Sequence, residues 1–282
     1  MAVGSCYGPR PANGRRFLRY HRDGLRLPTC RPARLGDDMI RPVGATAAVT
    51  TAALNNAEWC DVVCRTNGIV GVFEADVWAS PSRTPPYFPD AVTLESNVAD
   101  ERILKLVDTT PGCSVKDSFA SLDLSPAGFH ILFEAEWISR STAPPAHPSR
   151  VAIDWLPILT ARELEAWESV WSGGRPTDRV FLPALLPHHS VAVLGGYLDG
   201  RLVAGFVLNQ TRDVVGVSNL FTTAGEIADA WSAVSRRWLG SRRHARSSAT
   251  NRASPWQRPR SRASSRSGRS ACGSRSVPTD AG

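Results

Sequence analysis

The sequence predicts an α/β (α+β) protein made of two small units, each with its own mixed sheet. Three observations lead to this fold class. Helix-like and strand-like spacings of apolar residues alternate along the middle of the chain. A Pro-rich stretch over 142–148 divides that region. Finally, 282 residues with 42% hydrophobic content provide for one large or two small domains.

The second unit, residues 150–238, has the clearer pattern. Thr160 and Glu163 form a capping box at a helix start, and Gly173 with Gly174 can end that helix. Asp199-Gly200 is a strong hairpin signal. The predicted elements are a strand over 151–156, a helix over 160–171 with Leu164, Trp167 and Trp171 on one face, a three-stranded meander over 191–198, 201–209 and 214–221, and a capped helix over 223–238.

The first unit, residues 41–140, has a fainter pattern. Its predicted elements are a helix over 55–65, strands over 69–79 and 91–95, a helix over 100–107, and strands over 114–118 and 129–138.

The two ends of the chain have the composition of disordered segments. Residues 1–40 are rich in Arg, Pro and Gly, and residues 239–282 hold 10 Arg and 11 Ser in 44 positions. Neither segment shows a helical or strand period, and such composition buries too little apolar surface to offset its ordering entropy. We therefore expect both ends to be disordered.

Each end also allows a genetic interpretation. The structured pattern begins just after Met39, so Met39 is a candidate start, with a disordered tail as the alternative. Arg and Ser dominate when a GC-rich gene is read out of frame. Codons that can encode residues 262–274 can also encode an apolar, strand-like peptide when they are read in another frame. We interpret 239–282 as out of frame, with a nucleic-acid-binding Arg/Ser tail as the alternative.

The charge of the chain is divided between its ends and its middle. The net charge is +5 over 1–40, −9 over 41–235 and +11 over 236–282, which gives +7 in total. The acidic middle excludes a nucleic-acid-binding body, so only weak, non-specific binding through the Arg-rich tails is expected. No apolar run approaches the ~20 residues of a membrane-spanning helix, so no membrane partner is expected.

Other residues with chemical potential have ordinary explanations. The six Cys are scattered without a C-x-x-C pair, which favours a reducing, cytoplasmic location and no metal site. For four further patterns we favour a structural or solvated role over metal binding or catalysis: His188-His189, Cys60 with Cys64, Glu134 with Glu136, and Lys116-Asp117-Ser118.

The order strand, helix, three-stranded meander and capped helix over 150–238 resembles the first two-thirds of a GCN5-related N-acetyltransferase domain. The first unit resembles a degenerate half of the same fold in tandem. The resemblance implies transfer of an acyl group from acetyl-CoA, or a related acyl-CoA, to the amine of a small molecule or peptide of unknown identity. It names no catalytic residue.

In that family the fourth strand pairs with the pantetheine arm, and the following loop holds the pyrophosphate at a helix start. The resemblance therefore implies these cofactor-binding residues: Val217, Ser218 and Asn219 in the strand, and Thr222, Thr223, Ala224 and Gly225 in the loop.

The sequence also departs from the family. The loop has a single Gly and no basic residue, and Glu226 and Asp229 would repel a pyrophosphate. No strand-like segment follows Trp238, so the edge of the strand over 214–221 is expected to be unpaired and acetyl-CoA binding weak. A non-catalytic or defective protein is the alternative reading, and nucleic-acid binding through the tails is a third.

Overall fold

The structure is a computed structural model, which describes residues 2–6, 16–21, 41–42, 46–140, 153–174, 179–212 and 214–224. Side chains are described from Thr46 onward. The predicted tail 239–282 and the predicted helix beyond Ala224 lie outside these residues. Within the described part of the chain, no helix is long and apolar enough to cross a membrane.

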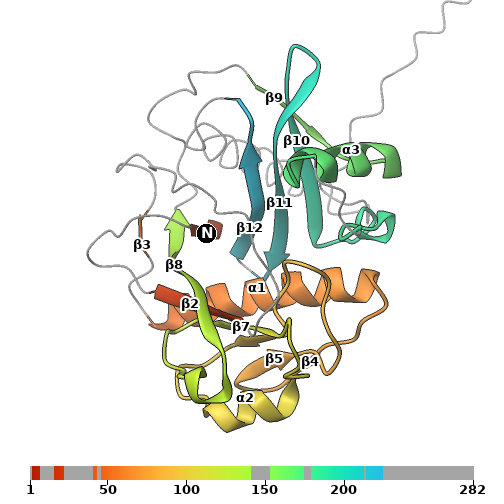
Figure 1. The fold of residues 1–282 in the computed structure, drawn as a ribbon. Coiled ribbons are helices and arrows are strands. Elements are labelled where there is room, and N and C mark those ends of the chain that lie inside the picture. Colours follow the sequence, from red (N-terminus) through yellow and green to blue (C-terminus); the bar gives the residue numbers. More distant parts are fainter. Residues whose placement is uncertain are drawn as a thin grey trace, which may run out of the picture.

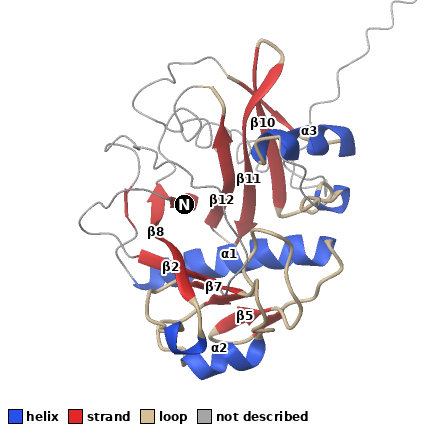
Figure 2. Cartoon of the chain, in the orientation of Figure 1, coloured by secondary structure: helices blue, strands red, loops and turns tan. Residues whose placement is uncertain are grey.

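Mixed α/β structure is confirmed (Figures 1 and 2). The helices are α1 (Thr46–Thr66), α2 (Asp100–Leu106) and α3 (Ala161–Trp171), with two short 3-10 turns at Ser125–Ala127 and Pro183–Leu185. The strands are β1 (Ala2–Cys6), β2 (Arg16–His21), β3 (Arg41–Pro42), β4 (Val72–Phe73), β5 (Val77–Ala79), β6 (Ala91–Thr93), β7 (Ser114–Asp117), β8 (His130–Arg140), β9 (Asp154–Pro157), β10 (Val191–Leu198), β11 (Arg201–Thr211) and β12 (Val214–Thr222).

The two predicted units correspond to two groups of four strands. The order β4-β5-β6-β7 belongs to the first unit, and β12-β11-β10-β9 belongs to the second. Strands β2, β8 and β1 lie between them and join both groups into one hydrogen-bonded path, with β3 paired to β8. The sheets of the two units are therefore continuous.

Local signals of the second unit are confirmed. Thr160 and Glu163 form both bonds of the capping box, and α3 buries Leu164 and Trp167. Gly173 follows the helix with a φ of +71°. The turn Asp199-Gly200 has positive φ at both residues, 49° and 75°, as a two-residue hairpin of the observed twist requires.

Two elements of the first unit differ from the prediction. Helix α1 begins at Thr46, well before the predicted start at residue 55. The predicted strand over 69–79 is a hairpin, β4 and β5, whose turn is closed by a hydrogen bond of 2.8 Å from the Glu74 amide to Val77 O. Arg102 on α2 also forms ion pairs with Glu74 and Asp76 of this turn, which contains no Gly.

Within residues 1–40, the structure describes two short strands, β1 and β2, that the sequence pattern does not predict. Strand β1 pairs with both β8 and β12, and β2 pairs with both β7 and β8. The interpretation of Met39 as the start would remove these two strands from the sheet. The local sequence of β1 and β2 gives no strand pattern, because the strands that they pair with lie far away in sequence.

Helix α1 carries the core that links the units. Figure 1 shows it running beneath the β10–β12 meander and above the strands of the first unit. One cluster of buried residues extends from Val49 and Trp59 of α1 to Trp78 and Val92 of the first unit and to Trp167 of the second. A separate cluster lies under β10, β11 and β12 on the opposite face, around Phe206 and Leu208.

Candidate functional site

Strand β12 has two different neighbours on its two edges. Strand β11 pairs with it antiparallel along almost its whole length. On the other edge, β1 pairs with it in parallel, but only from Ala2 opposite Val215 to Gly4 opposite Val217. The expectation that this edge is unpaired is therefore wrong over Val215–Val217.

The two parallel strands then part. Strand β1 continues along β8, with Ser5 opposite Trp137 and Cys6 opposite Glu136. Strand β12 continues along β11 to Thr222, without a described partner on the β1 side beyond Val217. A stretch of backbone over 218–222 is thus left at the edge where the strands separate.

A β-bulge marks the point of separation. Val207 pairs with Ser218 and Gly205 pairs with Phe221, so Asn219 and Leu220 together oppose the single residue Phe206. Asn219 has a φ of +53°, in the left-handed region. Bulges break the regular ladder and turn backbone groups in new directions, which is why they recur next to binding sites.

The side chain of Asn219 is held from another part of the chain. Its Oδ1 accepts a hydrogen bond of 3.2 Å from Nε1 of Trp59, on α1. Of the other strand residues implied by the resemblance, Val217 is buried beside Leu208 and Ser218 is half-buried.

The loop after β12 is closed by its own hydrogen bonds. The amide of Thr223 donates to Val203 O at 2.7 Å, and the amide of Ala224 donates to Thr222 Oγ1 at 3.2 Å. A pyrophosphate could take the Ala224 amide only by displacing Thr222 Oγ1. Gly225, Glu226 and Asp229 lie outside the described residues.

Polar groups beneath β12 fix α1 to the meander. Asn55 Nδ2 donates to Asn209 O at 3.1 Å and to Thr211 Oγ1 at 2.9 Å, while Asn209 Nδ2 donates to Asn55 O at 2.8 Å. Thr211 Oγ1 also donates to Glu58. Gly216 of β12 packs directly against this group, because a Cβ there would overlap Asn55 Oδ1.

The other residues singled out in the sequence are mostly structural. Cys60 and Cys64 are buried, and burial raises the pKa of the Cys64 thiol, which keeps it protonated. Lys116 lies 4.3 Å from the centre of the Trp137 ring, and Ser118 is fully buried. Within the described residues, no group of three or more His, Cys, Asp or Glu could hold a metal ion.

The histidine pair is also explained by packing. The rings of His188 and His189 stack with centroids 5.0 Å apart, and His188 Nδ1 is 3.0 Å from Ser190 Oγ. Burial, and to a lesser extent His189, lower the pKa of His188, so it is neutral at physiological pH.

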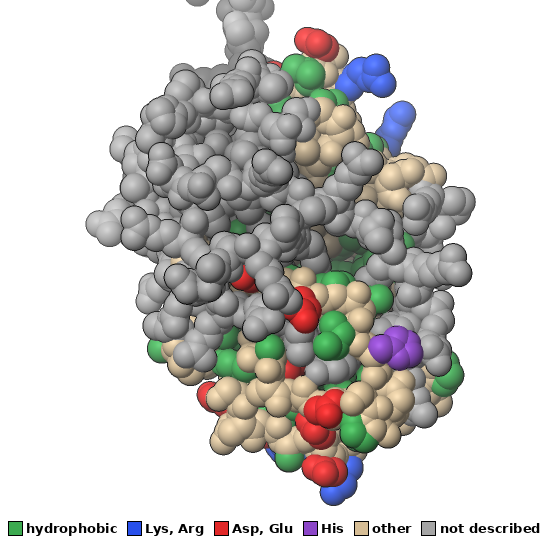
Figure 3. All heavy atoms as spheres, turned by 60° about the vertical axis from the view of Figure 1, so that its left-hand side comes forward, with side chains coloured by type: hydrophobic (Ala, Val, Ile, Leu, Met, Phe, Trp, Pro, Cys, Tyr) green, Lys and Arg blue, Asp and Glu red, His purple; other side chains and the backbone are tan. Residues whose placement is uncertain are grey.

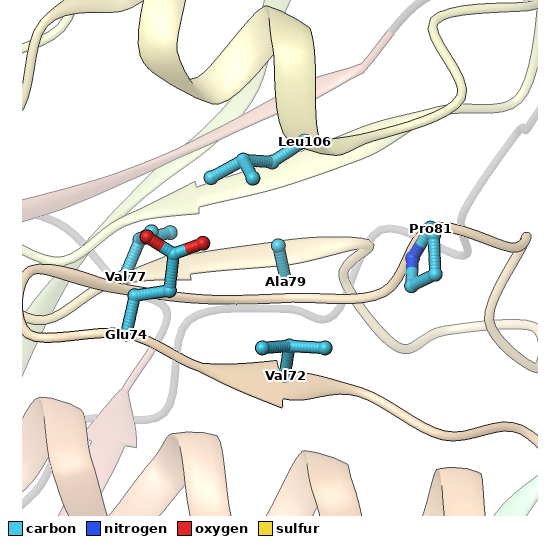
Figure 4. A pocket seen from close by; sticks show the side chains of 6 residues that line it. All are labelled: Val72, Glu74, Val77, Ala79, Pro81 and Leu106. Carbon is cyan, nitrogen blue, oxygen red and sulfur yellow. The ribbon is translucent and has the colours of Figure 1, made fainter.

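A small hollow lies at the opposite end of the sheet. It measures about 110 Å³ and is lined by Val72, Glu74, Val77, Ala79, Pro81 and Leu106 (Figure 4). Ligand pockets usually measure about 300–1,000 Å³, so this hollow is too small for a cofactor such as acyl-CoA.

Figure 3 shows separate acidic side chains over the lower half of one face, with few basic ones among the coloured atoms. This agrees with the acidic charge of the middle of the sequence.

Sequence reasoning missed two contributors to the β12 edge, Trp59 and β1. Trp59 could have been found as part of the apolar face of the helix, but its hydrogen bond to Asn219 could not.

Comparisons with protein-family models, with curated proteins and with solved structures give no match for this chain.

Proposed function

We propose that this chain is an acyl-CoA-dependent N-acyltransferase that binds the pantetheine arm along residues 218–222 of β12. The observation that carries the proposal is the parting of two parallel strands, β1 and β12, at the bulge around Asn219. An amide-bearing ligand in extended conformation can add to such an edge through main-chain hydrogen bonds, as peptides do in β-augmentation.

The chemistry follows from the resemblance and from this geometry. The amine nitrogen of the acceptor attacks the thioester carbonyl carbon, the carbon–sulfur bond breaks, and the thiolate of CoA leaves. The amine gives up its proton to a carboxylate or to water. Backbone amides near the bulge would stabilise the oxygen that becomes negatively charged during the attack.

The family resemblance supplies the choice of ligand, and the β1 strand answers the main objection to it. A missing neighbour for β12 was one reason to expect weak binding, beside the acidic residues and single Gly of the loop that follows. Strand β1 supplies that neighbour from the start of the chain, in the parallel direction that the cleft needs. The tight Thr222–Ala224 turn makes the pyrophosphate contacts the weaker part of the site.

Calorimetric titration of acetyl-CoA into the full chain tests the proposal, and we expect saturable binding. Leu220→Pro should abolish it, because Pro removes an edge N–H and disfavours the left-handed conformation of the preceding residue. Leu156→Pro in β9, at the far edge of the sheet, is the matched control and should leave binding intact. Absence of binding to the unaltered chain, or equal loss in both variants, would contradict the proposal.

A further inference from the structure

The bulge in β12 depends on a residue that does not adopt its backbone conformation freely. Asn219 is not a glycine, yet it has a φ of +53°. Left-handed backbone costs most residues about 1–2 kcal/mol, and Asn tolerates it best when its side chain is hydrogen-bonded. Without such a bond, the strand could relax to a regular ladder by one-residue slippage against β11.

The bond that Asn219 makes is well placed to prevent this slippage. Its partner Trp59 is only 2% exposed, so the indole N–H has little contact with water. A buried N–H that loses its acceptor costs about 1–3 kcal/mol. The backbone conformation of Asn219 and the pairing of the Trp59 N–H are therefore coupled, since both depend on the same hydrogen bond.

Trp59 itself has little freedom to follow Asn219. Its ring stacks on Phe181 at 6.3 Å and meets Phe88 edge-on at 6.0 Å. One turn earlier, Asn55 ties α1 to β11 through three hydrogen bonds. Trp59 thus presents its N–H from a fixed position.

From these contacts we infer that Trp59 is a positioning residue, which holds the β12 bulge open for the acyl-CoA through its hydrogen bond to Asn219. This inference rests on the proposed function for its ligand. It gives the first unit a role: α1 sets the shape of a binding edge that belongs to the second unit. Trp59 is not a catalytic residue, because it acts only through Asn219.

A double-mutant cycle on the full chain tests the inference, with two separate measurements. Hydrogen exchange of the amides over 218–222 reports the bulge without any ligand, and calorimetry with acetyl-CoA reports binding. Trp59→Phe keeps an aromatic ring and loses the N–H. We expect about three- to tenfold faster exchange over 218–222 and a similar loss of affinity, as one hydrogen bond provides.

A second substitution, Asn219→Gly, distinguishes a positioning role of Trp59 from a general contribution to stability. Gly adopts the left-handed region without strain, so Asn219→Gly should keep the bulge and the affinity, while its Tm falls because Trp59 loses its acceptor. Adding Trp59→Phe to Asn219→Gly should then leave exchange and affinity unchanged. If Trp59 acted only through general stability, Trp59→Phe would cause the same loss in the Asn219→Gly chain as in the unaltered chain, which would overturn the inference.

Trp78→Phe is the matched control. Trp78 is also buried and also hydrogen-bonds to α1, through Asp61 Oδ1 at 3.1 Å, but this contact lies in the first unit. It should lower Tm without selective exchange over 218–222, and an equal effect there would overturn the inference. If the unaltered chain binds no acetyl-CoA, the proposed function fails, while the exchange measurements still decide whether Trp59 holds the bulge.

Discussion

Buried polar side chains in this protein are used to hold backbone segments. Asp117 is fully buried and accepts hydrogen bonds from the amides of Phe119, Ser121 and Leu122 at 3.0, 2.6 and 2.8 Å. This explains the Lys116-Asp117-Ser118 sequence, which looks like activation of a serine when read alone. Thr93 Oγ1 is a further donor at 3.4 Å, so the acceptor sites of this carboxylate are used in closing the turn.

Glu168 is a second buried carboxylate, and its charge makes stability depend on pH. It is 5% exposed and accepts from the amide of Val180 at 2.7 Å. Burial raises its pKa above the usual value. A raised pKa in the folded state means that its contribution to stability is full below the unfolded pKa and is lost as pH rises through the folded one.

Glu168→Gln should therefore stabilise the protein relative to the unaltered chain at neutral pH and not at acidic pH. The amide oxygen can still accept from Val180, but no charge is buried. Thermal melts between pH 4 and pH 8 measure the difference in Tm between the two chains. A difference that stays constant over this range would contradict the role assigned to the charge of Glu168.

Gly216 is required where α1 meets β12. An added Cβ would overlap Asn55 Oδ1 and lie 2.5 Å from Asn209 Oδ1. We expect Gly216→Ala to lower the free energy of unfolding by about 2–4 kcal/mol, because it overpacks the contact and breaks buried hydrogen bonds. Denaturant unfolding measures this loss. Ser218→Ala, on the same strand and half-buried, is the control and should cost little.

At the scale of elements, prediction from sequence succeeded where the signal is local. The capping box of α3 and the Asp199-Gly200 turn need only neighbouring residues, and both are as predicted. The start of α1 was missed because residues 46–54 include β-branched Thr and Val and show no capping box. The β4–β5 turn was missed because residues 74–76 include no Gly or Pro, and the Arg102 that pairs with two of them lies on another element.

The same distinction applies to the candidate site. The strand that carries Ser218 and Asn219 was predicted, but its bulge was not, since an Asn in the left-handed region gives no pattern in sequence. Strand β1 could not be predicted either. Strand formation depends on cross-strand neighbours more than on intrinsic preference, and the neighbours of β1 are at least 130 residues away.

Strand β1 can be tested by a single substitution. It lies between β8 and β12, so it is a central strand and Pro is not tolerated in its middle. Gly4→Pro should lower Tm and speed hydrogen exchange of residues 215–217. Asp154→Pro, at the first residue of edge strand β9, is the control. Unchanged exchange over 215–217 would favour the alternative in which the folded protein begins near Met39.

At the scale of the whole molecule, the two predicted units share one core. Aromatic contacts pass from one to the other: Phe181 meets Trp59 of α1 at 6.3 Å and Trp167 of α3 at 5.4 Å. Tyr87 of the first unit meets Trp171 of the second at 5.2 Å. Such contacts make each unit lose part of its core if the other unfolds, so neither is expected to be stable alone.

This sharing predicts a single cooperative unfolding transition for the full chain. Ile103 of α2 is fully buried in a cluster made of first-unit residues, whereas Leu164 of α3 lies in the core that both units share. Ile103→Ala and Leu164→Ala should each cost about 2–5 kcal/mol and shift the same transition in calorimetry, because the loss in either unit is transmitted through α1. Two transitions, with each substitution moving only one of them, would show that the boundary near 142–148 separates independent domains.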